Sequence, residues 1–104
     1  MYQKQLIKWD VYEISAGQSE LNNVKLRGRI RKYGIESGLN ILAENTQDIP
    51  GRVRIGVIED TDITDVEGFI KKIVPDSKLD LKMKGIYNPV LSKLKVNDET
   101  RYET

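Results

Sequence analysis

The chain has 104 residues, with 17 Lys+Arg against 16 Asp+Glu, a net charge of +1, no Cys and no His. This length predicts one domain with a single modest core, and 38% hydrophobic against 32% charged residues indicates a soluble protein with a highly charged surface. The missing residue types exclude disulfides, thiolate nucleophiles, Cys-based metal sites and the Ser/His/Asp triad. Any enzymatic chemistry must therefore use Arg, Lys, Asn, carboxylates, hydroxyls and backbone amides.

The two ends of the chain predict its organisation. Residues 1–5 lack the apolar core of a signal peptide, and no apolar run in the chain approaches the ~20 residues that a membrane span needs. We therefore expect a cytoplasmic protein with no membrane contact. Residues 1–96 are predicted to form the single domain and residues 97–104 a polar tail, because Val96 is the last aliphatic residue.

The first predicted element is a half-buried strand within residues 6–14. Its side chains Ile7, Trp9 and Val11 fall on one side of a period-2 pattern. Residues 15–19 have the composition of a turn.

Residues 24–38 fit two periodicities. Apolar residues alternating with basic ones predict a strand, through Val24, Leu26 and Ile30. A stripe at helical spacing predicts a helix, through Leu26, Ile30, Tyr33 and Ser37. Gly28 and Gly34 count against the helix, each by about 1 kcal/mol relative to Ala, whereas Gly38 stands where a helix C-terminal glycine commonly lies.

The second half of the chain is less ambiguous. Residues 39–45 form a short apolar run with a polar end, and residues 46–51 form a hairpin-type loop. The next strand is indicated by apolar residues that alternate with Arg52, Arg54 and Gly56, namely Val53, Ile55 and Val57. A helix follows on the spacing of Val66, Phe69, Ile70 and Ile73.

Both ends of this second helix carry signals. Thr64 and Glu67 fit a capping box at its start, and Val74 before Pro75 ends it, because the residue before a proline is pushed out of helical geometry. Further strands are predicted from Leu79, Leu81 and Met83 and, at the end, from Leu94 with Val96.

These elements predict an α+β fold. With residues 26–37 as a helix, the order is β-α-β-β-α-β plus a terminal strand, which is the ferredoxin-like sandwich of two helices on one face of a four- to five-stranded antiparallel sheet. With these residues as a strand, one helix would have to cover six strands and much apolar sheet would stay uncovered. We favour the helix.

The run Gly38-Leu-Asn-Ile-Leu-Ala-Glu-Asn-Thr-Gln-Asp48 resembles the acylphosphatase family, in which a helix ending in G-L is followed by a strand of the form x-G-W-V-x-N-L-x-D-G. Asn45 then lies on the family's catalytic asparagine. Counting back from Gly38 without a gap places Leu26-Arg27 on the family's F-R pair, so that Arg27 lies on the catalytic arginine. The resemblance covers roughly residues 6–96 and implies that residues 26–37 are the first helix.

The family's phosphate loop, G-R-V-Q-G-V, corresponds here to Ser19, Glu20, Leu21, Asn22, Asn23 and Val24. Both glycines, which let the backbone amides approach a phosphate closely, are replaced. Glu20 stands in place of a basic residue and would repel an anion. The resemblance therefore implies a degenerate phosphate loop.

The activity implied by the resemblance is hydrolysis of carboxyl-phosphate (acyl phosphate) bonds, without a cofactor, a metal or a covalent intermediate. Arg27 and the loop amides would hold the phosphoryl oxygens, and Asn45 would place the attacking water. The expected ligand is a small acyl phosphate or the phosphate anion. The altered loop favours a second hypothesis, a catalytically inactive binding or interaction module of the same fold.

Other interpretations of these residues stay open. Arg27 is also compatible with a solvated surface arginine, and Asn45 with an asparagine that begins a turn. A nucleic-acid patch or a solvated charged face would explain the basic residues Lys25, Arg27, Arg29, Arg31, Lys32, Arg52 and Arg54. The net charge of +1 favours the solvated face. Helix capping, rather than a metal site, is the preferred explanation for the carboxylates Glu59, Asp60, Asp62 and Asp65.

Overall fold

The computed structural model describes residues 7–17, 25–87, 89–92 and 95–96. Two helices and six strands follow one another in the order β1 (Trp9–Ala16), α1 (Leu26–Ser37), β2 (Ile41–Asn45), β3 (Val53–Ile58), α2 (Thr64–Ile73), β4 (Ser77–Ile86), β5 (Pro89–Val90) and β6 (Lys95–Val96). No helix in this part of the chain is long and apolar enough to cross a membrane.

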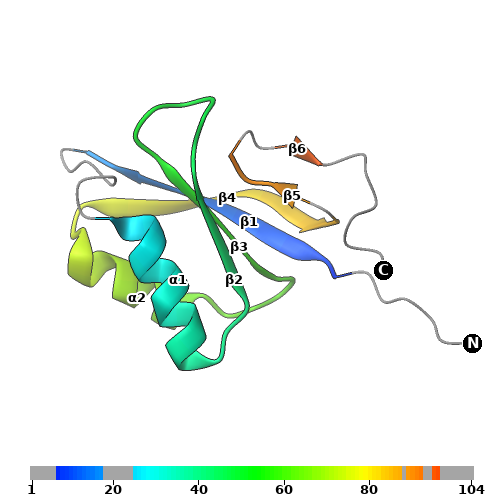
Figure 1. Ribbon diagram of the computed structural model, residues 1–104, viewed down its shortest axis with the longest axis horizontal. Helices are drawn as coiled ribbons and strands as arrows, with labels where there is room; N and C mark the ends of the chain where they lie inside the picture. The colour runs from blue at the N-terminus through cyan, green and yellow to red at the C-terminus, as the bar shows by residue number, and fades with distance from the viewer. Residues whose placement is uncertain (1–6, 18–24, 88, 93–94, 97–104) are drawn as a thin grey trace, which may run out of the picture.

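The first four strands form one antiparallel sheet with the order β2-β3-β1-β4. Both helices lie against one face of it (Figure 1). β5 and β6 pair with each other in a separate two-stranded sheet. The predicted α+β architecture, with two helices on a four-stranded antiparallel sheet, is therefore confirmed, and it is compatible with a ferredoxin-like fold.

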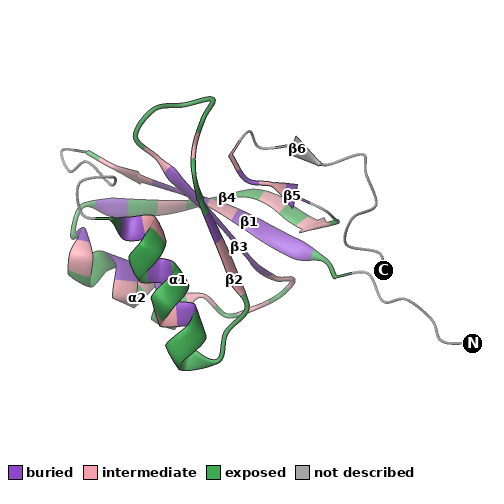
Figure 2. Cartoon of the chain, viewed as in Figure 1, coloured by how far each residue is buried: buried purple, intermediate pink, exposed green. Residues whose placement is uncertain are grey.

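The core lies between the helices and the sheet. Each helix contributes its apolar stripe, which is the burial that the helical spacing predicts. The buried members of this core are Ile14, Leu26, Ile30, Ala43, Val53, Ile55, Val66, Ile70 and Val74. Figure 2 shows that the buried residues of α1 and α2 face the sheet, whereas their outer faces are exposed.

Residues 24–38, whose sequence fits either a strand or a helix, contain helix α1, so the helical prediction is confirmed. The helix ends at Ser37 and is capped by Gly38, whose φ of 70° and ψ of 24° lie in the left-handed region that favours glycine. Gly34 suits its position for another reason, because a Cβ there would be crowded, at 3.2 Å from the Leu39 carbonyl oxygen and 3.3 Å from the Cβ of Ile41. This glycine, which counts against a helix by propensity, allows the helix to approach β2 closely.

Helix α2 begins differently from the prediction. The capping box of Thr64 and Glu67 is wrong, because Ile63 is the N-cap and Thr64 is the first helical residue. Asp62 supplies the acceptor instead: its Oδ1 accepts hydrogen bonds from the backbone N–H of Thr64 at 2.9 Å and from the Thr64 hydroxyl at 2.7 Å. A carboxylate is the stronger acceptor for these donors. The helix ends at Ile73, before Val74 and Pro75, as predicted.

Two strands of the predicted pattern, β1 and β4, need a correction each. β1 is buried on both faces rather than on one, since Trp9, Val11 and Ile14 are all buried. In β4, Leu81 is 49% exposed although its alternation with Leu79 predicts burial. β4 is an edge strand of the sheet. Its pairing with β1 is regular across Leu79 and Leu81, whereas register shifts interrupt the pairing farther along, between Trp9 and Tyr12 of β1.

The buried carboxylate of Asp10 anchors this irregular pairing. It accepts hydrogen bonds from the backbone N–H groups of Gly85 at 2.9 Å and Asp60 at 3.0 Å, and it lies 3.2 Å from the Lys84 ammonium. Burial would raise the pKa of Asp10, but these hydrogen bonds together bring it below its ordinary value. Asp10 is therefore a charged structural residue.

Candidate functional site

Arg27 and Asn45 lie together in the structure. Arg27 is in the first turn of α1, and Asn45 is the last residue of β2. Both line a pocket of about 310 Å³ whose other described lining residues are Lys25, Leu26 and Gly28. The two residues that the family resemblance assigns to catalysis thus share one pocket at the N-terminus of α1.

The Arg27 side chain is loosely held. Its Nε donates a long hydrogen bond of 3.4 Å to the Ala43 carbonyl and lies 3.7 Å from the Glu44 carboxylate. The side chain is 40% exposed. Among the described residues, this hydrogen bond and this ion pair of Arg27 both involve Nε, and neither involves its two terminal nitrogens.

The N-terminus of α1 is electropositive. Its N-cap, Lys25, has a left-handed backbone with φ of 54° and ψ of 43°, makes no side-chain capping hydrogen bond, and is followed by no acidic residue in the first turn. Helix N-termini carry partial positive charge and unsatisfied N–H groups, and Arg27 adds a full charge. Gly28 leaves room here, because a Cβ at this position would meet no atom within 4 Å. This arrangement favours an anion.

Helix α2 compensates its own N-terminus. Its first turn carries Asp65 and Glu67, and its last turn carries Lys71 and Lys72. Each charge opposes the partial charge of the helix end at which it lies. Among the two helices, α1 is therefore the one whose N-terminus lacks internal neutralisation.

The predicted phosphate loop, Ser19 to Val24, lies outside the described residues. The basic residues of α1 divide between the pocket and the open surface. Arg29, Arg31 and Lys32 are exposed on the helix, and Lys32 lies 3.8 Å from Glu36. Their role as a nucleic-acid or anion patch stays a prediction.

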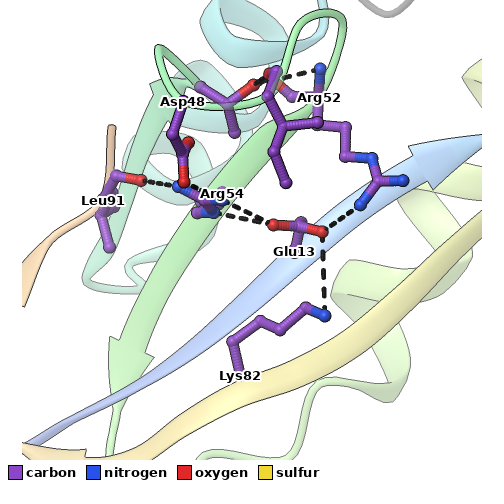
Figure 3. Close-up of polar contacts among 8 residues, drawn as sticks. Glu13, Asp48, Arg52, Arg54, Lys82 and Leu91 are labelled. Carbon is purple, nitrogen blue, oxygen red and sulfur yellow. Dashed lines mark hydrogen bonds and ion pairs between the residues drawn. The ribbon is translucent and has the colours of Figure 1, made fainter. Parts of the chain in front are cut away.

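Arg54 does not belong to any basic surface. Its side chain is 0% exposed and lies beside Glu13, which is 2% exposed. Together with Asp48, Arg52 and Lys82 these residues form what we call the Arg54 cluster (Figure 3). The sequence interpretations of Arg54, as part of a nucleic-acid patch or of a solvated face, are both wrong.

The Arg54 guanidinium donates four hydrogen bonds and makes a further close ion-pair contact. Glu13 Oε1 lies 2.9 Å from Nε and 2.8 Å from Nη2. The Asp48 carboxylate accepts from Nη1 at 2.8 Å and from Nη2 at 3.0 Å, and the Leu91 carbonyl accepts from Nη1 at 3.0 Å. These contacts and its complete burial place Arg54 within the fold and out of reach of a ligand at the surface.

The cluster keeps its carboxylates charged. Burial would raise the pKa of Glu13, but hydrogen bonds from Arg54 and Arg52 together hold it below its ordinary value. The hydrogen bonds from Arg54 also lower the pKa of Asp48. The signal for this pair is cross-strand register, since Glu13 lies directly opposite Arg54 between β1 and β3. The sequence gives each residue but not this pairing.

The carboxylates near the start of α2 are used by protein groups. Asp60 lies 2.7 Å from the Lys84 ammonium, and Asp62 binds Thr64 as described above. Within the described residues, no group of three or more metal-ligating side chains comes together.

Comparison of the chain with protein-family models, with curated proteins and with solved structures finds no match. The functional assignment therefore depends on the chemistry of the site and on the sequence resemblance.

Proposed function

We propose that the chain has a ferredoxin-like βαββαβ fold of the acylphosphatase type and hydrolyses carboxyl-phosphate bonds. The element order and the antiparallel strand order β2-β3-β1-β4 are compatible with this fold. The observation that carries the proposal is that Arg27 and Asn45, which the resemblance selects without any structural input, line one pocket.

In the proposed reaction, the terminal nitrogens of Arg27 and the N–H groups at the start of α1 bind the phosphoryl oxygens. Such donors stabilise the negative charge of the transition state without having to reorganise. Phosphoryl transfer requires mainly positioning and charge stabilisation from the protein, so the absence of His and Cys from the chain does not prevent it.

Asn45 has the complementary role. Its side-chain amide can both donate and accept hydrogen bonds, which suits it to orient a water for in-line attack on phosphorus. The acyl carboxylate then leaves, and the products are a carboxylic acid and inorganic phosphate. No covalent intermediate and no metal takes part in this scheme.

The direct test is release of inorganic phosphate from benzoyl phosphate or acetyl phosphate by the purified protein. We expect release above the spontaneous rate, loss of the enhancement in Arg27→Ala, and its retention in Arg31→Ala. Arg31 is an exposed arginine of the same helix outside the pocket, so it controls for a general loss of positive charge. Equal rates with and without wild-type protein would contradict hydrolysis.

One contact favours a second candidate function, a non-catalytic binding module of the same fold. The Glu44 carboxylate lies 3.7 Å from the Arg27 Nε and competes with any anionic ligand for this guanidinium. Phosphate binding at the pocket without hydrolysis would identify this module.

A further inference from the structure

The Arg54 cluster lies at the root of the loop that follows Asn45. The chain leaves β2 at Asn45 and returns in β3, and the carboxylate of Asp48 in this connection is bound by two nitrogens of Arg54. The loop is closed at its base by a hydrogen bond of 3.0 Å from the Thr46 N–H to the Arg52 carbonyl. Asp48 is therefore tied to the buried guanidinium three residues after the proposed catalytic asparagine.

Residues 89–92 hold the same loop from the other side. The Leu91 carbonyl accepts a hydrogen bond from Arg54, and the Ser92 carbonyl accepts one of 2.8 Å from the Gln47 N–H. Arg54 thus joins three separate parts of the chain, β1 through Glu13, the β2–β3 loop through Asp48, and the segment after β5 through Leu91. Figure 3 shows Asp48, Glu13 and Leu91 converging on it.

Stability alone gives little reason for such a cluster. Burial of paired charges costs desolvation free energy, and apolar residues of similar size often serve as well or better. What a bidentate guanidinium–carboxylate pair adds is direction, because its two parallel hydrogen bonds fix the relative orientation of the partners. Here the Arg54–Asp48 pair fixes the orientation of the loop that follows Asn45.

We propose that Asp48 and Arg54 are positioning residues that hold Asn45 in the orientation needed to place the attacking water. This inference rests on the proposed hydrolysis of acyl phosphates and adds a specific mechanical role for the cluster. Neither residue lines the pocket, so both act through the loop and not on the ligand.

Asp48→Asn tests this role, because the Asp48 side chain is 37% exposed and the substitution leaves the buried Glu13–Arg54 pair in place. We expect kcat for benzoyl phosphate to fall by roughly threefold to thirtyfold, the range for coupled residues that do not touch the ligand. The KM and the phosphate Kd should change by less than about twofold, because binding of the phosphoryl group does not involve Asn45. Asp65→Asn, at an exposed carboxylate of α2, is the matched control and should leave kcat, KM and the phosphate Kd unchanged.

A double-mutant cycle separates positioning from a general loss of structure. In an Asn45→Ala background, Asp48→Asn should cause no further loss in kcat, because the group that it positions is gone. An equal loss in both backgrounds, or a rise in KM at unchanged kcat, would overturn the proposal. Arg54→Lys, which keeps the charge but not the two-pronged geometry, should reproduce the effect of Asp48→Asn.

A spectroscopic readout makes the test independent of turnover. The side-chain amide resonances of Asn45 should shift in Asp48→Asn without substrate and stay unchanged in Asp65→Asn. The wild-type protein could show no hydrolysis while the Asn45 amide resonances still shift in Asp48→Asn. In that case the mechanical coupling stands and the proposed hydrolysis fails. If the Asn45 amide does not respond, the coupling is refuted whatever the activity.

Discussion

Arg27 and Arg54 are two arginines placed beside carboxylates, and the protein uses them in opposite ways. Arg54 is completely buried and makes five nitrogen–oxygen contacts of 2.8–3.0 Å. Arg27 is 40% exposed, with one hydrogen bond of 3.4 Å and one ion pair at 3.7 Å, both through Nε. Within the described residues, all three nitrogens of the Arg54 guanidinium donate hydrogen bonds to protein oxygens, whereas Arg27 donates one through Nε alone.

The comparison teaches that the number of satisfied donors, rather than the presence of a charge, distinguishes a structural arginine from a candidate binding residue. The two helices give the same lesson. α2 neutralises its N-terminus with Asp65 and Glu67, and α1 leaves its N-terminus electropositive beside the pocket.

The largest expected effect is on stability. Arg54→Ala leaves the buried Glu13 carboxylate without its main partner and should lower the free energy of unfolding by about 3–5 kcal/mol, whereas Arg27→Ala should lower it by less than about 1 kcal/mol. Urea unfolding of both variants measures the contrast. The double variant Glu13→Leu/Arg54→Met should recover most of the loss, because it removes both buried charges. Equal destabilisation by the two Arg→Ala variants would remove the distinction between these arginines.

For catalysis, Arg27→Ala is expected to have the large effect, although its effect on stability is the smaller of the two. Arg27→Ala should reduce kcat/KM for acyl phosphate hydrolysis by at least about 100-fold, or about 2.7 kcal/mol, since it removes a preorganised group that stabilises charge. The measurement is steady-state phosphate release, with Arg31→Ala as the control in the same helix. Full activity in Arg27→Ala would place the active site elsewhere.

Asn45→Ala should separate turnover from binding. We expect kcat to fall by roughly tenfold to hundredfold, because the attacking water loses its orientation, and the affinity for inorganic phosphate to stay nearly constant. Kinetics together with a phosphate titration of the same variant test this. A parallel loss of phosphate binding would mean that Asn45 contacts the anion and not the water.

A substitution at Gly28 tests how much stability α1 loses because its first turn has no acidic residue. Gly28→Glu should stabilise the protein by about 1 kcal/mol, because a better helix former replaces glycine and a carboxylate opposes the helix dipole. The same change should abolish phosphate binding. Gly68→Ala in α2, where a Cβ also meets no atom within 4 Å, should stabilise through propensity alone and leave phosphate binding intact. Retained phosphate binding in Gly28→Glu would separate the pocket from anion binding.

The smallest effect is in the response to acid. Because the pKa values of Glu13 and Asp48 are lowered in the folded state from ordinary values of 4.5 and 3.8, the unfolded chain binds more protons at acid pH. Their contribution to stability is present above these ordinary values and is lost as the pH falls through the lowered ones. Thermal melts should give a constant Tm from about pH 7 to 5 and a falling Tm below about pH 4.5. Asp48→Asn should weaken this dependence, and an unchanged profile would argue that Asp48 is not paired in solution.

The sequence was sufficient for most of the architecture because the apolar stripes are regular. Leu26 and Ile30 in α1, and Val66 and Ile70 in α2, lie at helical spacing and are buried as that spacing requires. The ambiguous α1 segment was assigned correctly because a single helix could not have covered the sheet. The prediction of Arg27 and Asn45 as site residues depends on their distances from Gly38 along the chain, and both residues line one pocket.

The features that could not be predicted depend on which residues become neighbours. Arg54 follows the same apolar–basic alternation as an exposed strand residue, and only its position opposite Glu13 makes its burial favourable. Leu81 alternates with Leu79 as a buried residue would, but it lies in β4 at the edge of the sheet, a place in the strand order that no local pattern specifies. At the start of α2, the sequence is compatible with either Asp62 or Thr64 as the acceptor for the first N–H groups. In the structure, Asp62 accepts the hydrogen bond from the Thr64 N–H.

The most direct test of the central claim is an NMR titration with inorganic phosphate at constant ionic strength. If the N-terminus of α1 and Arg27 form an anion site, the amide resonances of Arg27, Gly28 and Asn45 should shift together at millimolar phosphate, which corresponds to about 4 kcal/mol or less of binding free energy, and Arg27→Ala should abolish these shifts. Shifts spread over Arg29, Arg31 and Lys32 and removed by modest salt would instead indicate a general basic surface. That result, or the absence of any shift, would contradict the proposed site.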